Sequence, residues 1–301
     1  MTGRIDVNAA RRYRQLEAAL RAGHLRQNSP YATVNNPAWF AWVENEPIAL
    51  PQRRLVQNEI VARELQQSDL IDRSRVAIVT AGPPGAGKSH IENDVRDRLN
   101  PGGTWRVVDP DKFKSLLLRQ AIEDGSYSSL IPPGLETAHP LELAPLVHEE
   151  SSALASQIRE FSIRQGESVV IDGTLKGREK AERLVSYLVE SDYLVHLVDV
   201  ETTRVISLKR VFKRWYAGYR AAMMSVSSGA PRSAVMGGRW VPSSFVRELF
   251  QVGHTSICEQ VVEDVCLIHD DVKVQLERWR TNHEDSDPVK EFGDFRRPVN
   301  I

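Results

Sequence analysis

The stretch Val76-Ala77-Ile78-Val79-Thr80-Ala81-Gly82-Pro83-Pro84-Gly85-Ala86-Gly87-Lys88-Ser89 decides the fold of this chain. Its second half fits the pattern G-x-x-x-x-G-K-[ST], a loop whose backbone N–H groups cradle phosphate. We therefore expect a buried strand that ends near Thr80 and a helix that begins at Lys88. The three glycines of the loop allow the backbone conformations that a tight turn around an anion needs.

The loop residues have predicted roles in binding a nucleoside triphosphate. Lys88 supplies a full positive charge, the Ser89 hydroxyl is placed for Mg²⁺, and the helix N-terminus adds partial positive charge. An ordinary glycine–proline turn without a ligand is the alternative, but the Lys-Ser pair and the apolar flank favour a nucleotide site. The predicted nucleotide-binding residues are Gly82, Pro83, Pro84, Gly85, Ala86, Gly87, Lys88, Ser89 and His90.

Composition indicates an ordinary globular chain. Its 301 residues are 41% hydrophobic and 26% charged, with a net charge of −1 that provides no overall field to attract nucleic acid. The two cysteines, Cys258 and Cys266, fit neither a metal-binding spacing nor a disulfide framework. The chain shows neither a signal-peptide core nor a membrane-spanning run, so we expect a cytoplasmic protein with no membrane or nucleic-acid partner.

Strand and helix patterns alternate from Val76 onward, which predicts an α/β fold with a parallel sheet of about five strands sandwiched by helices. Two more amphipathic helices come first, one over residues 8–22 and one that opens at Pro51. The predicted strands are 76–80, 105–108, 168–171, 193–200 and 264–268, and the predicted helices are 89–99, 112–123, 141–165, 177–190, 202–225 and 244–260.

The second, third and fourth predicted strands each end close to an acidic residue, namely Asp109, Asp172 and Asp199. Ligands of open parallel sheets bind beyond the carboxyl ends of the strands, so these carboxylates would face the triphosphate. For Asp199, capping of the following helix is an equally good interpretation. Residues 217–238 are rich in small side chains and predict a mobile lid, with an ordinary surface loop as the alternative. The residues after Asp271 are expected to be loosely held.

The remaining motifs indicate transfer of a phosphoryl group to a hydroxyl. Neither the D-x-x-G and N-K-x-D strings of regulatory GTPases nor the L-S-G-G-Q string of transporter ATPases occurs. Asp111 is the candidate base for the acceptor hydroxyl, and Asp109 is a candidate for Mg²⁺ water or helix capping. The turn with Asp172, Thr174 and Lys176 suits a polyhydroxylated, anionic acceptor, and guanidinium groups can clamp the moving phosphoryl group. The candidate guanidinium groups are Arg214 and Arg239.

These motifs resemble those of the zeta toxin family of small-molecule kinases, in the family's order and over about residues 52–270. The motifs are Gly82–Ser89, Asp109 to Phe113, Asp172 to Lys176, Arg214 in Lys213-Arg214-Trp215, and Arg239 in Gly238-Arg239-Trp240. The resemblance implies a P-loop kinase fold that uses ATP and Mg²⁺ to phosphorylate the 3′-hydroxyl of UDP-N-acetylglucosamine. It also implies a toxin that a helical antitoxin protein restrains.

The resemblance implies a role for each matched residue. Lys88 and Ser89 match the nucleotide and metal positions, and Asp111 matches the proton acceptor. The sugar-nucleotide contacts are Asp172 and Thr174 with Lys176 beside them, and the phosphate-stabilising arginines are Arg214 and Arg239. His148 is a further candidate for the acceptor pocket, with a solvated helix face as the alternative. Asp172 stands where the best-known members have glutamate, and Lys176 replaces an arginine. These two departures bear on the identity of the acceptor more than on the phosphoryl-transfer chemistry.

We therefore predict a helical extension (residues 1–50), a zeta-toxin-like kinase body (residues 51–275) and a tail (residues 276–301). One hypothesis makes the extension a restraint on the kinase in cis, and a simple packing role is the alternative. Other acceptors remain open: an NAD-like dinucleotide, an antibiotic or a polynucleotide end. A non-catalytic ATP-binding module is the alternative outside enzymes.

Overall fold

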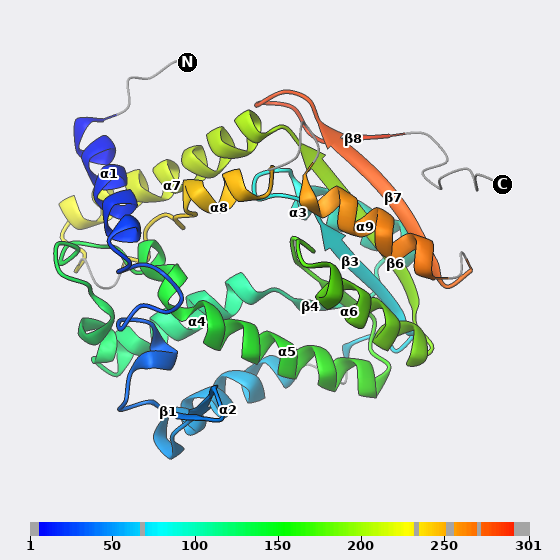
Figure 1. Cartoon of the computed structure of the whole chain (residues 1–301), viewed down its shortest axis with the longest axis horizontal. Coiled ribbons are helices and arrows are strands. Elements are labelled where there is room, and N and C mark those ends of the chain that lie inside the picture. Colours follow the sequence, from blue (N-terminus) through cyan, green and yellow to red (C-terminus); the bar gives the residue numbers. More distant parts are fainter. Residues whose placement is uncertain (1–5, 67–69, 232–234, 251–255, 270–271, 292–301) are drawn as a thin grey trace. The chain divides into compact units, whose positions relative to one another are not determined.

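The computed structural model describes residues 6–66, 70–231, 235–250, 256–269 and 272–291, and most of its helices and strands are labelled in Figure 1. The α-helices in these ranges are α1 (Val7–Arg21), α2 (Pro51–Leu65), α3 (Lys88–Leu99), α4 (Pro110–Glu123), α5 (His148–Gln165), α6 (Arg178–Glu190), α7 (Arg204–Ser227), α8 (Ser243–Glu248) and α9 (Ile257–Ile268). The strands are β1 (Phe40–Val43), β2 (Glu46–Ala49), β3 (Val76–Ala81), β4 (Arg106–Val108), β5 (Val169–Ile171), β6 (Leu194–Thr202), β7 (Val274–Thr281) and β8 (Val289–Lys290). Short 3₁₀ helices are η1 (Thr33–Asn35), η3 (Ser126–Leu130) and η4 (Pro140–Val147).

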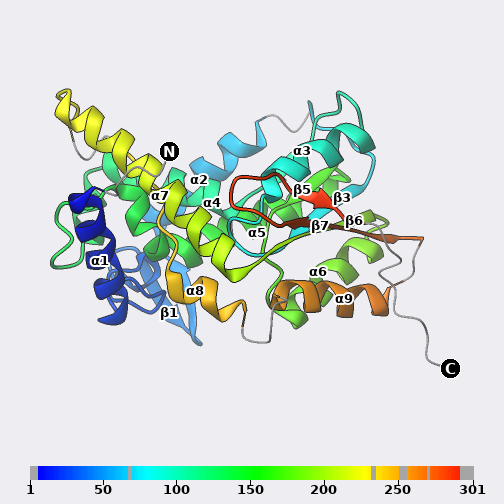
Figure 2. The same ribbon diagram turned by 90° about the horizontal axis from the view of Figure 1, so that it is seen from above.

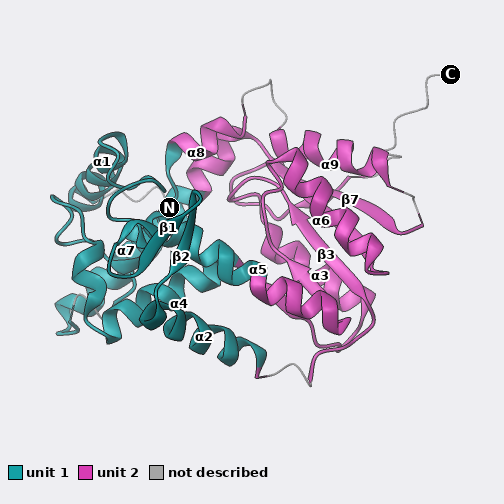
Figure 3. Cartoon of the chain, turned by 60° about the horizontal axis from the view of Figure 1, so that its bottom comes forward, with its two compact units in different colours: residues 1–65, 110–156, 211–243 teal, residues 66–109, 157–210, 244–301 magenta. Residues whose placement is uncertain are grey.

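The chain divides into two compact units, coloured separately in Figure 3. We call residues 1–65, 110–156 and 211–243 the helical unit, and residues 66–109, 157–210 and 244–301 the sheet unit. The predicted division into extension, body and tail stays a prediction, because it rests on family resemblance whereas the units group residues by contact.

The sheet unit is built on a six-stranded sheet in the order β4-β5-β3-β6-β7-β8. The pairs among β4, β5, β3, β6 and β7 are parallel, and β8 pairs with β7 in the antiparallel direction. This confirms the predicted α/β class with a mostly parallel sheet. The strand that enters the glycine-rich loop, β3, is central and buried, as its run of β-branched residues predicts.

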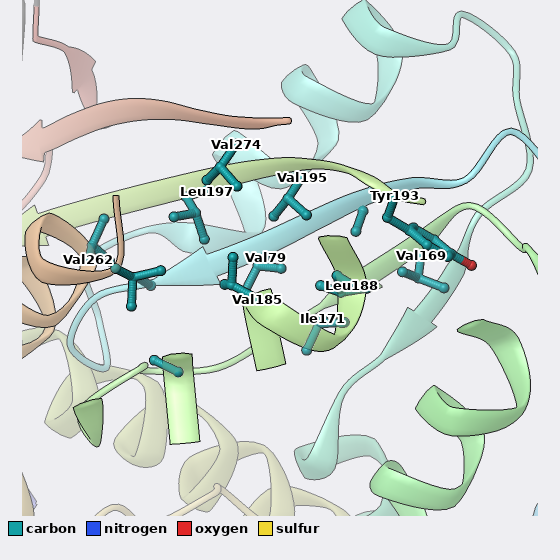
Figure 4. Close-up of a cluster of buried hydrophobic side chains, with 14 of the residues drawn as sticks. Val79, Val169, Ile171, Val185, Leu188, Tyr193, Val195, Leu197, Val262 and Val274 are labelled. Carbon is teal, nitrogen blue, oxygen red and sulfur yellow. The ribbon is translucent and has the colours of Figure 1, made fainter. Parts of the chain in front are cut away.

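Helices cover both faces of this sheet, with α3 on one side and α6 and α9 on the other (Figure 2). Side chains alternate along β3, so that Ala77 and Val79 face α6 and α9 while Ile78 faces α3. The larger core cluster joins strand residues such as Val79 and Leu197 to helix residues such as Leu188 (Figure 4).

Two predictions near the C-terminal end of the sequence are wrong. Residues 264–268 belong to helix α9, and the fifth parallel strand is β7. Buried residues Cys258, Val261, Val262 and Val265 repeat at helical spacing, which the short apolar run at 264–268 obscures. Likewise, residues 274–281 are not loosely held, because all of β7 pairs with β6.

Residues 217–227 of the predicted lid continue helix α7, so the alternative of an ordinary surface loop is wrong for this part, and the lid role stays a prediction. Serines in this last part of the helix donate to the carbonyl four residues earlier, as Ser227 does to Met223 at 2.8 Å. Gly218 has a packing role, because a Cβ at that position would lie 2.5 Å from the Cα of Gly238. Residues 232–234 lie outside the described residues.

The helical unit holds its first helices through buried ion pairs. Arg53 of α2 donates through Nε and Nη2 to both carboxylate oxygens of Glu150, each at 2.7 Å. Trp39 covers the guanidinium, whose carbon lies 4.6 Å from the ring centroid. Removal of one partner of such a pair leaves a buried charge uncompensated and costs about 3–5 kcal/mol. Helix α2 is thus packed into this unit. No helix in the described ranges is long and apolar enough to span a bilayer.

Asp199 does not cap a helix. It lies inside β6, fully buried, and accepts from Nε of Arg278 on β7 at 3.0 Å. Glu201 lies two residues further on the same face of β6 and accepts from the Ser256 hydroxyl at 2.7 Å. Burial, reinforced by the neighbouring Asp199 charge, raises the pKa of Glu201 to about 9, so this carboxyl is protonated at neutral pH.

Replacement of Glu201 by glutamine is expected to remove a stability loss at high pH. The raised pKa means that the folded state binds a proton that the unfolded state releases, so stability falls as pH rises from 4.5 and the loss is complete above about 9. Relative to Glu201→Gln, the wild-type protein should lose about 2 kcal/mol between pH 7 and pH 9, measured by urea unfolding.

Glu277→Gln is the control, because the pKa of Glu277 is lowered. Burial by itself raises the pKa of Glu277, but the hydrogen bonds from Lys290 and Arg98 lower this pKa by more. Its contribution is present above the unfolded pKa and lost in acid, so Glu277→Gln should destabilise the protein at neutral pH. Parallel pH profiles of wild type and Glu201→Gln would contradict the assignment.

Candidate active site

The glycine-rich loop connects β3 to α3 in the sheet unit, as the sequence predicts. Gly82, Gly85 and Gly87 all have positive φ, at 118°, 83° and 105°. Gly82 also lies directly on β6, because a Cβ there would be 2.0 Å from the carbonyl oxygen of Val200. Both the backbone conformation and the close approach therefore exclude a side chain at this position.

Side chains from distant parts of the sheet unit bind the carbonyl oxygens of the loop. Ser207 Oγ donates to Pro84 O at 2.6 Å, and Arg210 Nη1 donates to Gly85 O at 3.1 Å. Thr281 Oγ1, at the end of β7, donates to Ala86 O at 2.7 Å. In a planar trans peptide the N–H points away from the C=O. Because the carbonyl groups of Pro84 and Ala86 point toward these donors, the N–H groups of Gly85 and Gly87 point to the opposite side of the loop. The result is a set of donors suited to a phosphate.

Lys88 and Ser89 open helix α3 at this loop. The Lys88 ammonium donates to Gly82 O at 3.0 Å, so its charge lies across the loop. The side of the loop toward Ser89 and His90 is exposed. The first N–H groups of a helix have no partner within the helix, and together with Lys88 they favour an anion. Phosphate binding is the function that this geometry suits.

The turn after β5 lies beside the loop. Thr80 Oγ1 donates to Asp172 Oδ1 at 2.7 Å, and the Gly82 N–H donates to Thr174 O at 3.3 Å. These bonds bring Asp172 and Thr174 next to the phosphate loop. Lys176 is exposed, and its ammonium lies 4.6 Å from the Phe245 ring centroid.

Three carboxyl groups of the sheet unit interact near the loop. Burial raises the pKa of Glu92 to about 7. The negative charges of Asp172 and Asp109 raise this pKa further, whereas the positive charge of Arg96 lowers it. Glu92 lies one helical turn after Ser89, and the sequence analysis missed it because a glutamate inside a helix looks like a solvated residue. Sequence reasoning also missed Arg210, whose Nε binds Glu284 O at 3.0 Å while Nη1 binds the loop.

The side-chain oxygen atoms near the loop are suitable ligands for Mg²⁺. Carboxylate and hydroxyl oxygens are its preferred ligands, and a cation would relieve the mutual repulsion of these carboxyl groups. In the described ranges no group of three His, Cys, Asp or Glu side chains could hold a metal. Nucleotide-bound Mg²⁺ takes one or two carboxylates plus phosphate oxygens. The hydroxyl of Ser89 and the carboxylate of Asp109 are compatible with the protein part of such a ligand set. Their role as metal ligands stays a prediction.

The other predicted residues lie in the helical unit, where the structure brings Asp111 and Arg239 together. Asp111 is in the first turn of α4, Arg239 forms an ion pair with its Oδ2, and Lys114 Nζ donates to Oδ1 at 3.0 Å. Arg214 is an exposed residue of α7, and His148 is a half-buried residue at the start of α5. Neither is among the contacts just described, so their roles stay predictions.

The sequence matches the Zeta toxin family model over residues 62–283. This match extends over most of the chain and includes the phosphate loop, Asp111, the Asp172 turn and both predicted arginines.

The chain belongs to the zeta toxin family.

The chain also has matches among solved structures. The AvrRxo1-ORF1:AvrRxo1-ORF2 complex with sulphate ions has a TM-score of 0.50 and 20% identity, covering 80% of this chain and 67% of that chain. The complex with ATP has a TM-score of 0.49 and 20% identity over the same shares. The PezAT chromosomal toxin–antitoxin system of the human pathogen Streptococcus pneumoniae has a TM-score of 0.47 and 15% identity, covering 78% of this chain and 80% of that chain. Among curated proteins, none matches this sequence.

Thr281→Val is expected to weaken ATP binding. The substitution keeps the shape of the side chain but removes the donor to Ala86 O, so the peptide before Gly87 is no longer held. Affinity for a non-hydrolysable ATP analogue, measured by titration calorimetry, should fall by about tenfold.

Thr202→Val is the matched control. Thr202 is equally buried and also donates to a backbone carbonyl, that of Thr281 at 3.0 Å, but not to the phosphate loop. Both variants should lose stability, whereas only Thr281→Val should lose ATP affinity. Equal effects on affinity would show that the carbonyl bond does not orient the loop.

Proposed function

We propose that this protein is an ATP- and Mg²⁺-dependent kinase that phosphorylates the 3′-hydroxyl of UDP-N-acetylglucosamine and acts as the toxin of a toxin–antitoxin system. Membership of the zeta toxin family supports a phosphotransferase that binds ATP, and a toxin. The observation that carries the chemistry is the Asp111–Arg239 ion pair in a chain with a well-formed phosphate loop. This pair places the candidate proton acceptor beside a candidate phosphoryl-stabilising group.

Chain connectivity supports joint action of Asp111 and the nucleotide. Asp109 follows β4 directly in the sheet unit, and Asp111 is two residues later, at the start of α4. Two residues of chain span at most about 7 Å, so the candidate base stays close to the candidate metal ligand. Arg214 is likewise one helical turn beyond Arg210, which binds the phosphate loop.

In the proposed reaction the acceptor hydroxyl transfers its proton to the Asp111 carboxylate as its oxygen attacks the γ-phosphorus in line. The bond from the γ-phosphorus to the bridging oxygen breaks, and ADP leaves. Lys88, Arg214 and Arg239 stabilise the charge on the transferring group, while the N–H groups of the loop hold the other phosphates. Ser89 and Asp109 would hold Mg²⁺, which would supply further positive charge beside the phosphate oxygens.

The acceptor is proposed to bind at the turn that follows β5. Asp172 is held there by Thr80, and Thr174 is held by its backbone bond to Gly82. A carboxylate and a hydroxyl so fixed can receive the hydroxyl groups of a sugar, and Lys176 adds a cation for a nucleotide phosphate. The aspartate is shorter than the glutamate of other members and Lys176 lacks the fork of arginine, so a related nucleotide-linked acceptor is the nearest alternative. A helical antitoxin and a cytoplasmic location, where ATP is available, complete the proposal.

Incubation with labelled ATP and UDP-N-acetylglucosamine tests the acceptor directly, with mass analysis of the product. We expect one phosphate on the sugar. A parallel reaction with a metabolite extract identifies any other acceptor, which would replace UDP-N-acetylglucosamine while the kinase assignment stands. ATP binding without transfer to any metabolite would favour a non-catalytic module and end the proposal.

Asp111→Asn is expected to lower kcat by at least about 100-fold, because the amide accepts no proton. ATP affinity should be unchanged. Glu123→Gln, at the exposed end of the same helix, is the control and should keep full activity. Near wild-type transfer by Asp111→Asn would show that another group takes the proton.

A further inference from the structure

Helix α1 lies outside the residues that the family model matches, yet its side chains are integrated into the helical unit. Ala9 and Leu16 are fully buried. Arg12 is also buried and donates through Nε to Glu142 Oε2 at 2.9 Å. A charge buried this deeply is held in place by its partner, so the contact fixes the position of α1 relative to η4.

Glu142 joins three elements of the helical unit. Its side chain is fully buried and accepts hydrogen bonds from Arg12, from Trp215 Nε1 at 3.1 Å, and from the His139 N–H at 2.9 Å. These donors come from α1, α7 and the residue before η4. Because a buried carboxylate with three donors has few alternative arrangements, Glu142 fixes α7 and η4 with respect to each other.

Arg239 is held in a segment that packs on these same residues. Leu141 N–H donates to Met236 O at 2.9 Å, and Trp240 N–H donates to Leu141 O at 3.4 Å. A Cβ on Gly238 would lie 2.0 Å from Trp215 O, so the backbone just before Arg239 lies directly on α7. The residues that Glu142 orders thus form the support of Arg239, which pairs with Asp111.

Two more contacts of α1 are with residues close to Arg239 or its support. The ring of Tyr13 packs edge-on against Trp215, with centroids 5.2 Å apart. Glu17 Oε1 accepts from the N–H of Ser243 at 3.1 Å, a few residues after Arg239. Helix α1 therefore contacts each part of the chain that supports Arg239. These parts are η4, α7 and the residues that follow Arg239.

We propose that α1 is a positioning element for phosphoryl transfer, in which Arg12, through Glu142, fixes the segment 236–240 and so keeps Arg239 beside Asp111. This inference rests on the proposed function, because it takes Arg239 and Asp111 as catalytic residues. It makes α1 part of the working enzyme.

The chain offers a matched control in Arg53. Its ion pair with Glu150 is as buried as that of Arg12 with Glu142. It also fastens an N-terminal helix to the unit, but its partners are Glu150 and Trp39. Arg12→Met and Arg53→Met both break a buried ion pair, so both should destabilise the protein, and only Arg12→Met disturbs the support of Arg239.

The test compares the full-length Arg12→Met, Arg12→Lys and Arg53→Met proteins with wild type below their unfolding temperatures. For Arg12→Met we expect kcat to fall about 10- to 100-fold with the KM for ATP unchanged, because a small displacement of a charge-stabilising group has effects of this size. Arg12→Lys should recover part of the rate, and Arg53→Met should keep the wild-type kcat. Equal kcat losses in Arg12→Met and Arg53→Met, or none in Arg12→Met, would overturn the proposal.

Hydrogen exchange separates this test from that of the proposed function. The Leu141 and Trp240 N–H groups should exchange faster in Arg12→Met than in Arg53→Met. If the wild-type protein transfers phosphate to no acceptor, the proposed function fails, and this measurement decides whether α1 holds the segment. Equal exchange of these two N–H groups in both variants would overturn the positioning role whatever the activity.

Discussion

The closure of the phosphate loop against β6 is the constraint on which the sheet unit depends. Gly82 lies so close to Val200 that no side chain fits, and Ser207, Arg210 and Thr281 bind the outward carbonyl groups of the loop. These donors are 123 to 195 residues away along the chain. They reach the loop because β6 pairs with β3 and β7 pairs with β6. The sheet order therefore sets the direction of the peptide dipoles, and those dipoles make the loop a phosphate site.

Buried charge organises the helical unit in a comparable way. The Arg12–Glu142 and Arg53–Glu150 pairs are almost fully inaccessible. Such pairs contribute little net stability, since desolvation offsets their attraction, but a broken pair is costly, so they select one arrangement over others. In this unit they join α1 to η4 and α2 to α5. A packing role for the N-terminal residues accounts for these contacts, and a restraint on the kinase in cis stays a hypothesis.

Most of the parallel sheet could be predicted because its strands are buried on both faces, and such strands read as apolar runs. Strand β7 could not. Its face toward α9 carries Arg278 and Arg280, which pair with acidic residues, so the sequence looks solvent-exposed. The apolar run at 264–268 was mistaken for this strand because five residues are too few to separate a helix from a strand by periodicity. Among the candidate site residues, Asp111 and Asp172 could be selected from motifs, whereas Glu92 and Arg210 could not, because isolated charged residues on helices have no distinguishing spacing.

The sequence alone determined the phosphate loop, the strand before it, the helix after it and the family motifs, because each depends on residues close together in the chain. Only the tertiary structure decided which donors bind the loop, that Asp199 pairs with Arg278, and that Glu142 links α1 to the support of Arg239. These contacts join residues far apart in sequence. Whether a charged side chain is solvated or paired inside the protein depends on what the fold places beside it, and local composition does not contain that information.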